Sequence, residues 1–480
     1  MRLREVVFES LESRTVLDGS VLPFVAYFPE GFAADNINEY VPITNPNAAQ
    51  VKFELHARYE WGERDQLIYA GELPPNSRDG VTICETTRPD DTLVRKSVPY
   101  ALILRSSLPV SATLSHYDFG TAVGESFTTT TNLRWSFADG LKSSALSRDY
   151  ILVFNPNAVA TNVTLTLYGT DGEIMQRSLT VSPERRAGWS IEDIPGMPTG
   201  VFAATVVADQ PVVASQSHYE LQTQRGYGLL GTPGGGQTAG VITSIDYDDS
   251  FYDTNGEGPG NPTHFQADSF ISFLNTGDIL AVVNLSFFTN TPGPDPQPSD
   301  RVVLVNPHSR ATFAVRDQGL PQGTEYGVLY RSPVPITVMG AIYQGQDGTG
   351  VNAQVFGATV WDFGEGFMSR NRAGGRVQED IYLFNPTADV VDVSMIFYFL
   401  DGTTFTINMS IESLGFENVT VHEVAEIVNH GASSYYGVRI AGSSPIVTSL
   451  EHWDGSIGGG FSTFGMMSGS VANLIDLLPQ

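Results

Sequence analysis

Cysteine and lysine are almost missing from this 480-residue chain, which limits the covalent cross-links that it can form. The single cysteine, Cys84, cannot form an intrachain disulfide, and the apolar residues before it favour a buried position. Only three lysines occur, and none follows Lys142, so a lysine cross-link within the later part of the chain is excluded. The stability of the protein must therefore come from packing.

Positive charge and long apolar runs are scarce as well. The chain has 26 Lys and Arg against 53 Asp and Glu, which gives a formal net charge of −27. Nucleic acids and anionic lipid surfaces would repel such a chain, so both are poor partners. No run of 18 apolar residues occurs, and no membrane-spanning helix is predicted. The N-terminal region also lacks the apolar core of an ordinary cleaved signal peptide.

A strand pattern that follows an asparagine turn occurs four times. The turns begin at Asn45, Asn155, Asn275 and Asn385, which lie 110, 120 and 110 residues apart. In each repeat the residues eight, ten and twelve positions after the asparagine are apolar, and the ninth is polar. This alternation predicts a strand with one buried face, because successive side chains of a strand point to opposite sides.

Two further landmarks support the same alignment. In each repeat a proline precedes a histidine or isoleucine by seven residues, in the pairs Pro109 and His116, Pro211 and His218, Pro335 and Ile342, and Pro445 and His452. An aromatic segment with an acidic residue lies between the repeats, around Phe28, Phe137, Tyr247 and Phe363. A period of this length is too long for a solenoid and suits β-sandwich domains of about 100 residues.

We therefore predict an all-β protein, a tandem array of four Ig-like antiparallel β-sandwich domains. The expected parts are an N-terminal segment at 1–23, sandwiches at 24–130, 131–241, 242–358 and 359–470, and an apolar tail at 471–480. Helix is expected only between Val421 and Asn429, where apolar residues share one face and a glycine follows.

The chain resembles the tandem repeats of secreted and cell-surface bacterial proteins, in which an aromatic-Phe-Ala-Glu-Gly segment precedes a strand ending in Asn-Pro-Asn. The resemblance spans roughly residues 24 to 470 and is weakest in the third repeat, which has Asn275-Thr276-Gly277. It implies an exported β-repeat protein without a known activity. Residues 8–17 also resemble the short export tag of planctomycete bacteria, and an amphipathic first helix is the alternative.

The repeated histidines suggest an enzyme, because Ser115, His116 and Asp118 are close in sequence. However, neighbours on a strand point to opposite faces, so Ser115 and His116 could not form a catalytic pair. The third repeat has Ile342 in place of the histidine, which favours a packing position. Phosphate-binding, metalloprotease and esterase motifs are missing, and the glycine run at 234–236 is interpreted as a loop. We predict that the protein is not an enzyme.

An acidic stretch near the start of the third repeat is the most site-like segment. Its candidate Ca²⁺ ligands are Asp246, Asp248, Asp249, Asp253, Asn255 and Glu257. Hard divalent cations take six to eight oxygen ligands, which this composition can supply. The spacing does not match an EF-hand, so a solvated loop is the alternative. Tyr252 and Trp453 could stack on sugars, although aromatic residues of sandwiches also serve as core or interface.

Repetition without a repeated chemical group favours a non-enzymatic extracellular structural protein, a subunit of a cell-surface filament, fibre or layer. In this hypothesis Tyr27 and Phe28 are exposed and dock on the last domain of another copy, which gives a head-to-tail homopolymer. The tail residues expected to take part are Leu474, Ile475, Leu477 and Leu478. The alternative is a Ca²⁺-assisted adhesin or a glycan-binding surface protein.

Overall fold

A computed structural model describes residues 22–34, 37–61, 65–83, 94–143, 146–247, 267–290, 299–344, 347–368, 377–430, 434–454 and 459–479. Within these ranges nearly all regular structure is strand, and neighbouring strands pair in an antiparallel manner. The all-β prediction is therefore confirmed. Helix is limited to η1 (Ile191–Asp193), η2 (Val315–Gln318), η3 (Val421–Glu423), α1 (Ala425–Val428) and α2 (Leu474–Leu477). The helix expected at Val421 to Asn429 is thus present as two short pieces.

The described strands form four units with a common order. Unit 1 contains β1 (Phe24–Phe28), β2 (Asn38–Asn45), β3 (Val51–Tyr59), β4 (Gln66–Leu73), β5 (Ser77–Thr82), β6 (Tyr100–Ser106), β7 (Ser111–Asp118) and β8 (Thr121–Ser126). Unit 2 contains β9 (Asn132–Phe137), β10 (Leu141–Lys142), β11 (Ser147–Asn155), β12 (Thr161–Gly169), β13 (Gly172–Val181), β14 (Arg185–Ser190), β15 (Gly200–Val201), β16 (Ala203–Glu220), β17 (Arg225–Leu230) and β18 (Thr232–Pro233).

The second half of the chain repeats this order. Unit 3 contains β19 (Gln237–Tyr247), β20 (Ala267–Asn275), β21 (Ala281–Phe288), β22 (Ser299–Val305), β23 (Ser309–Ala314), β24 (Thr324–Gln344) and β25 (Asp347–Asn352). Unit 4 contains β26 (Phe356–Phe363), β27 (Phe367–Met368), β28 (Val377–Phe384), β29 (Val391–Phe399), β30 (Thr404–Ile411), β31 (Phe416–Thr420), β32 (Ser434–Asp454) and β33 (Gly459–Phe464), and β34 (Met466–Asn473) follows it.

Each unit is a sandwich of two antiparallel sheets. In unit 1 the sheets have the orders β1-β6-β3-β4 and β5-β2-β7-β8, and their apolar faces share one core. In the other units one long strand, β16, β24 or β32, takes the place of β6 and β7 and passes from one sheet to the other. The alternation after each asparagine predicted this packing correctly, since Leu55, Leu165, Leu285 and Met395 are all buried.

The asparagine that begins each turn is buried because its amide joins three segments. The Asn155 Nδ2 donates hydrogen bonds to the carbonyl oxygens of Val159, Val181 and Ser182 at 2.8, 3.2 and 3.1 Å. Its Oδ1 accepts one from the backbone N–H of Asn157 at 3.0 Å. The equivalent asparagines of the other three units make the same kinds of contact. A buried side-chain amide must be satisfied in this way, which explains the repeat's first landmark.

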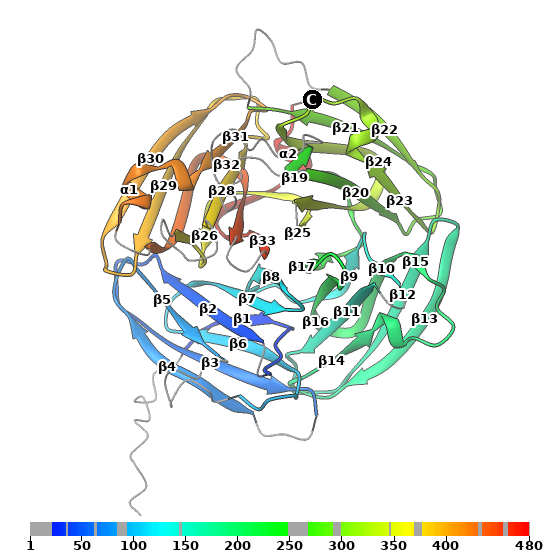
Figure 1. Ribbon diagram of the computed structural model, residues 1–480, viewed down its shortest axis with the longest axis horizontal. Helices are drawn as coiled ribbons and strands as arrows, with labels where there is room; N and C mark the ends of the chain where they lie inside the picture. The colour runs from blue at the N-terminus through cyan, green and yellow to red at the C-terminus, as the bar shows by residue number, and fades with distance from the viewer. Residues whose placement is uncertain are drawn as a thin grey trace, which may run out of the picture.

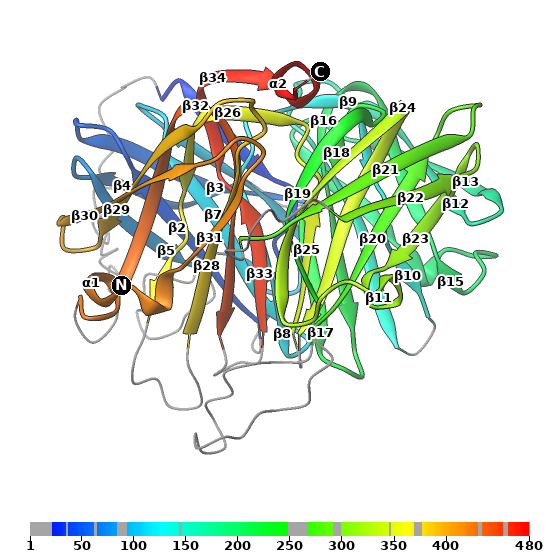
Figure 2. The same cartoon turned by 90° about the horizontal axis from the view of Figure 1, so that it is seen from above.

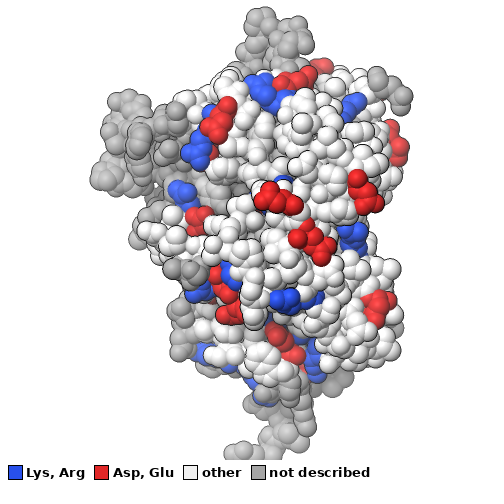
Figure 3. Space-filling view, turned by 90° about the vertical axis from the view of Figure 1, so that its right-hand side faces the viewer, with Lys and Arg blue, Asp and Glu red and all other residues white. Residues whose placement is uncertain are grey.

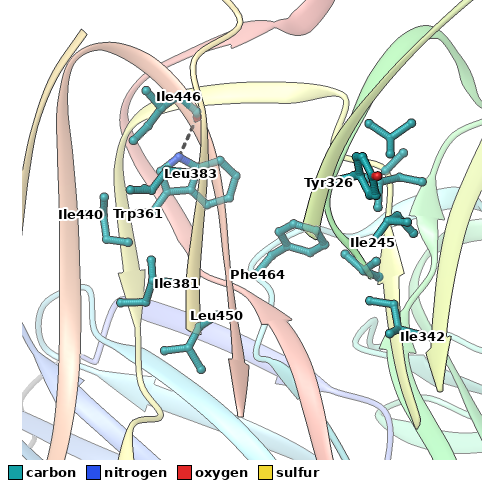
Figure 4. Packing of buried hydrophobic residues seen from close by; sticks show 14 of the residues in the cluster. Ile245, Tyr326, Ile342, Trp361, Ile381, Leu383, Ile440, Ile446, Leu450 and Phe464 are labelled. Carbon is teal, nitrogen blue, oxygen red and sulfur yellow. Dashed lines mark hydrogen bonds between the residues drawn. The ribbon is translucent and has the colours of Figure 1, made fainter. Parts of the chain in front are cut away.

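The four units close into a ring (Figure 1). Around its centre lie β8, β17, β25 and β33, one from each unit, and each of these strands packs against two of the others. The last unit therefore contacts the first. The described cores of units 3 and 4 are continuous, and Phe464 lies between Trp361 and Leu450 on one side and Ile245 and Tyr326 on the other (Figure 4).

Candidate functional site at the unit junctions

The aromatic segments between the repeats are the parts that join one unit to the next. In two of them a tryptophan is buried and its Nε1–H donates to a main-chain carbonyl, from Trp135 to Val212 at 2.8 Å and from Trp361 to Ile446 at 2.9 Å. The glycine that ends each segment is required by close packing. A Cβ at Gly140 or Gly366 would overlap the ring of Phe202 or Tyr436.

In three of these segments the acidic residue reaches across to the following unit. Glu30 of unit 1 accepts a hydrogen bond from the hydroxyl of Ser217 in unit 2. Asp139 of unit 2 accepts one from Ser272 of unit 3 at 2.9 Å.

The same contact is made between unit 4 and unit 1. Glu365 of unit 4 accepts a hydrogen bond from Ser115 of unit 1 at 3.0 Å. A second contact joins these units near the centre, where the Glu125 Oε1 accepts from the Thr463 Oγ1 at 2.8 Å and from the Phe464 N–H at 3.1 Å. Three junctions therefore use the equivalent acidic residue, and the third of them joins the last unit to the first.

Three of the junctions also bury an arginine at one equivalent strand position. Arg310 of unit 3 lies 2.7 Å from the Asp139 Oδ1 of unit 2, and Arg186 of unit 2 lies 3.2 Å from Glu60 of unit 1. In unit 1 burial lowers the pKa of Arg78, and attraction to Glu365 opposes that shift. Each arginine thus places a positive charge against the acidic edge of the preceding unit.

The junction between units 3 and 4 has a buried phenylalanine where the others have this arginine. Phe416 takes the equivalent place, and nearby Glu325 accepts hydrogen bonds from Tyr382 and Asn418 of unit 4. Loss of solvent, with repulsion from Asp380 and Asp246, raises the pKa of Glu325 to about 8. The charge of Glu325 at this junction therefore changes with pH near neutrality.

The predicted histidines lie inside the sandwiches, where they bond to carboxylates. In unit 1 the His116 Nδ1 is 2.7 Å from the Glu39 Oε1, and the Tyr100 hydroxyl donates to the other carboxylate oxygen. The Phe32 N–H also donates to Glu39 at 2.8 Å, which ties the junction segment to the sandwich. Unit 4 repeats this cluster with His452, Glu379, Tyr436 and Phe367.

Unit 2 has a variant of the cluster, and unit 3 has lost it. In unit 2, His218 bonds to Asp149 at 2.9 Å, and Gln216 replaces the tyrosine as a donor to this carboxylate. Burial opposes the charged form of His218, yet attraction to Asp149 outweighs it and raises the pKa of the imidazole. The hydrogen bonds to Glu39 and Glu379 likewise raise the pKa of His116 and His452 against the effect of burial. These buried pairs brace the junction segments.

The structure separates the residues that suggested a catalytic site. Ser115 points into the junction toward Glu365, whereas His116 points into its own sandwich toward Glu39. Trp453 lies in strand β32, where it pairs with Gln378. Tyr252 lies outside the described residues, as does Cys84.

Of the two aromatics predicted to be exposed, Phe28 is buried and Tyr27 is half-buried. Phe28 is buried against Phe127, and Tyr27 packs on Phe154 of unit 2 with ring centroids 5.7 Å apart. In the tail, Leu474 and Leu478 are buried, Leu477 is half-buried and Ile475 is exposed.

The tail itself covers the junction between units 3 and 4. Leu474 and Leu478 pack there in one cluster with Val241 and Leu329 of unit 3. Helix α2 lies at one rim of the ring, beside the C-terminus (Figure 2). Phe28, Leu474 and Leu478 are thus packed within one molecule, whereas Ile475 is exposed, and head-to-tail docking stays a prediction.

Of the proposed Ca²⁺ ligands, the structure describes one. Asp246 is the last residue but one of strand β19, and its backbone N–H and carbonyl both bond to the Ser269 hydroxyl. The other five candidates, Asp248, Asp249, Asp253, Asn255 and Glu257, lie outside the described residues. Across the described ranges no group of three or more His, Cys, Asp or Glu is arranged to hold a metal ion. Those ranges also contain no helix that is long and apolar enough to cross a membrane.

Sequence reasoning missed the central strands. Each carries small residues two positions apart, in the pairs Ala122 and Gly124, Gly226 and Gly228, Gly348 and Gly350, and Gly460 and Ser462. A Cβ at Gly124 would lie 2.7 Å from the Phe461 ring of unit 4, and one at Gly350 would lie 2.7 Å from the Tyr227 ring of unit 2. The repeated small residues were the available signal that these strands meet other strands closely.

Comparison with known proteins places the chain in a family without an assigned function. A family model described as a family of unknown function, DUF5719, matches residues 134–403, and the chain belongs to this family. No curated protein matches it.

Several solved structures are similar to parts of the chain. The Thermotoga maritima protein 1070 is 14% identical over 25% of this chain and 94% of its own, with a TM-score of 0.19. The Anabaena sensory rhodopsin transducer is 22% identical over 22% and 91%, with a TM-score of 0.16. A tetra-tandem repeat from the extending region of a large adhesion protein is 10% identical over 90% and 92%, with a TM-score of 0.11. At these scores the likenesses carry no argument about this chain.

Proposed function

We propose that this chain is a non-enzymatic structural protein of the cell exterior, in which four sandwich domains act together as one rigid ring. The observation that carries the proposal is the repeated junction. The acids Glu30, Asp139 and Glu365 are each bonded to the next unit, and the last of these bonds leads back to unit 1. These acidic side chains hold neighbouring units together, as expected of a protein whose role is structural.

The chemistry of the buried polar groups supports the same proposal. The histidines bond to carboxylates inside the sandwiches and are about 1–2% exposed, so a substrate has no access to them. The resemblance to exported repeat proteins supports a location outside the cell. If the protein forms a layer or fibre, the closed ring is the building block, and contacts between copies would use its faces or its outer sides. The Ig-like assignment of the sandwiches stays a prediction.

The outer side of the ring is a mixed surface. On the side formed by units 2 and 3, acidic and basic side chains are interspersed among uncharged ones (Figure 3). Such a surface resists nonspecific association, which suits a protein exposed to the medium. The second candidate, a glycan-binding surface protein, is favoured by one cavity at the junction of units 2 and 3.

Ring closure can be tested by a cross-link between the first and last units. The Ser126 Oγ and the Thr463 Oγ1 are 2.8 Å apart, so cysteines at these positions would be adjacent. The variant Ser126→Cys, Thr463→Cys and Cys84→Ser should form an intramolecular disulfide on mild oxidation, which leaves a monomer of altered mobility on a non-reducing gel. The control is the same chain with only one of the two new cysteines. A ladder of disulfide-linked oligomers would contradict the closed ring.

The location requires a separate experiment. An antibody against the ring should label intact cells of the native source, and the labelling should be removed by external protease. Labelling that occurs only after lysis would contradict the proposed place outside the cell. The ring and the location are thus tested independently.

A further inference from the structure

The asparagine turn of unit 3 has a glycine where units 1 and 2 have a second asparagine, and a cavity lies beside it. In units 1 and 2 the second asparagine of the turn, Asn47 or Asn157, donates from its Nδ2 to the carbonyl of Pro109 or Pro211 at 2.7 or 2.8 Å. Unit 3 has Gly277 at this position, so it has no side chain to make the bond. Its backbone nevertheless keeps the same turn, because the Gly277 N–H donates to the Asn275 Oδ1 at 3.0 Å as in units 1 and 2.

A cavity of about 470 Å³ that opens to solvent lies beside this turn, between units 2 and 3. Gly277 and Pro335 line it, and the Arg134 side chain of strand β9 forms its wall on the side of unit 2. The Arg134 Nε is buried and has no hydrogen-bond partner among the described residues. This volume lies within the range of small-molecule sites. An unsatisfied guanidinium N–H in a cavity of this size indicates a place for an anionic ligand group.

The other walls combine a hydroxyl-binding side with an apolar side. Asp278 and Thr276 line the cavity, and the Asp278 Oδ1 bonds to the His308 Nε2 at 2.7 Å. The Asp278 side chain is 92% exposed, and its Oδ2 can accept a hydrogen bond from a ligand hydroxyl. Ile279 and Val334 give an apolar surface, and the Ile279 side chain is 66% exposed.

We propose that this cavity binds a hexuronic acid unit of an acidic carbohydrate. The Arg134 guanidinium offers parallel donors to the sugar carboxylate, since its planar fork matches carboxylate geometry. Asp278 and Thr276 bond to ring hydroxyls, and the C–H face of the sugar packs on the apolar wall. A simple carboxylate would leave the hydroxyl-binding side unused, and a neutral sugar would leave Arg134 unpaired. The inference is independent of the proposed scaffold function.

The test is saturation-transfer NMR on the full chain, with sodium glucuronate as the probe and glucose and acetate as comparison ligands. Glucuronate should receive saturation and bind about tenfold more tightly than either comparison ligand, because only it uses both sides of the cavity. Absence of transfer to glucuronate would overturn the proposal. Equal binding of acetate would overturn its carbohydrate part and leave a carboxylate site.

Two variants locate the binding in this cavity. Gly277→Asn restores the side chain of units 1 and 2, which can donate to the Pro335 carbonyl, so it should narrow the cavity and weaken glucuronate binding by about tenfold or more while the thermal melt is unchanged or higher. Arg134→Gln should weaken glucuronate binding but not glucose binding. Thr387→Asn, the same change at the equivalent turn of unit 4, is the matched control and should bind as the parent does. Parent-like binding by Gly277→Asn would overturn the site, and it would leave the cross-linking test of the ring unaffected.

Discussion

At the scale of single residues, the buried asparagines show how one side chain can hold three segments. Asn155 is completely buried, and its amide satisfies three carbonyl oxygens that would otherwise face an apolar interior. Asn155→Ala should therefore reduce the free energy of unfolding by about 2–4 kcal/mol, since buried acceptors lose their donor. Urea unfolding of the full chain measures this change. A loss below that of an exposed control, Thr164→Ala, would show that the carbonyls find other donors.

The buried face of the strand after this turn makes a second prediction at the same scale. Leu165 is completely buried between the sheets of unit 2. Leu165→Ala should cost about 2–5 kcal/mol, because it removes apolar contacts and leaves a cavity. Thr164 is the adjacent residue on the other face, where its hydroxyl meets that of Ser178, and Thr164→Ala should cost much less. If thermal melts of the two variants coincide, the assigned faces of β12 are wrong.

At the scale of elements, the junctions depend on charges that lie on different units. Arg310 is 2% exposed and meets both Asp139 of unit 2 and Ser272 of its own unit. Arg310→Gln should destabilise the fold by about 3–5 kcal/mol, because it leaves the Asp139 carboxylate without its partner. Chemical unfolding followed by tryptophan fluorescence gives the change.

The control for this prediction is a solvent-exposed pair in the same unit. Arg316 and Asp268 form an ion pair at the surface, and the Arg316 side chain is about half exposed. Arg316→Gln should therefore cost about 1 kcal/mol or less. Similar losses for the two arginine variants would show that burial at the junction adds nothing to the Arg310 contact.

At the scale of the whole molecule, the junction acids make stability depend on pH. Burial raises the pKa of Glu325 to about 8, that of Asp380 to about 7 and that of Glu125 to about 7. Between the usual carboxyl value and these values the unfolded chain releases protons that the folded chain keeps, so the free energy of unfolding falls as pH rises. Histidines with a raised pKa act in the same direction, because their contribution is lost as pH rises through the folded value.

The ring should therefore melt at a higher temperature at about pH 5.5 than at about pH 8.5. Thermal melts across this range test the sign, and Glu325→Gln should flatten the dependence, because an amide does not ionise. An increase of the melting temperature with pH in the parent chain would contradict the assignment. If the melting temperature of Glu325→Gln changes with pH as that of the parent does, Glu325 is not the group responsible.

Local pattern was enough to predict strands, turns and the faces that they bury. Side chains two apart on a strand share a face whatever the rest of the chain does, so the alternation after Asn155 indicated the burial of Leu165 before any contact was known. The same rule separated Ser115 from His116 correctly. These features depend on neighbours in sequence, and the sequence contains them directly.

Closure of the ring could be read only from the tertiary structure. Ser115 bonds to Glu365 across 250 positions of sequence, and Ser126 meets Thr463 across 337. Four equal units form an open array or a closed circle according to the rotation between neighbours, and no local pattern encodes that angle. It is determined by how small residues such as Gly124 and Gly350 let strands of different units approach, which is why Phe28 and the tail residue Leu474 are buried in one molecule.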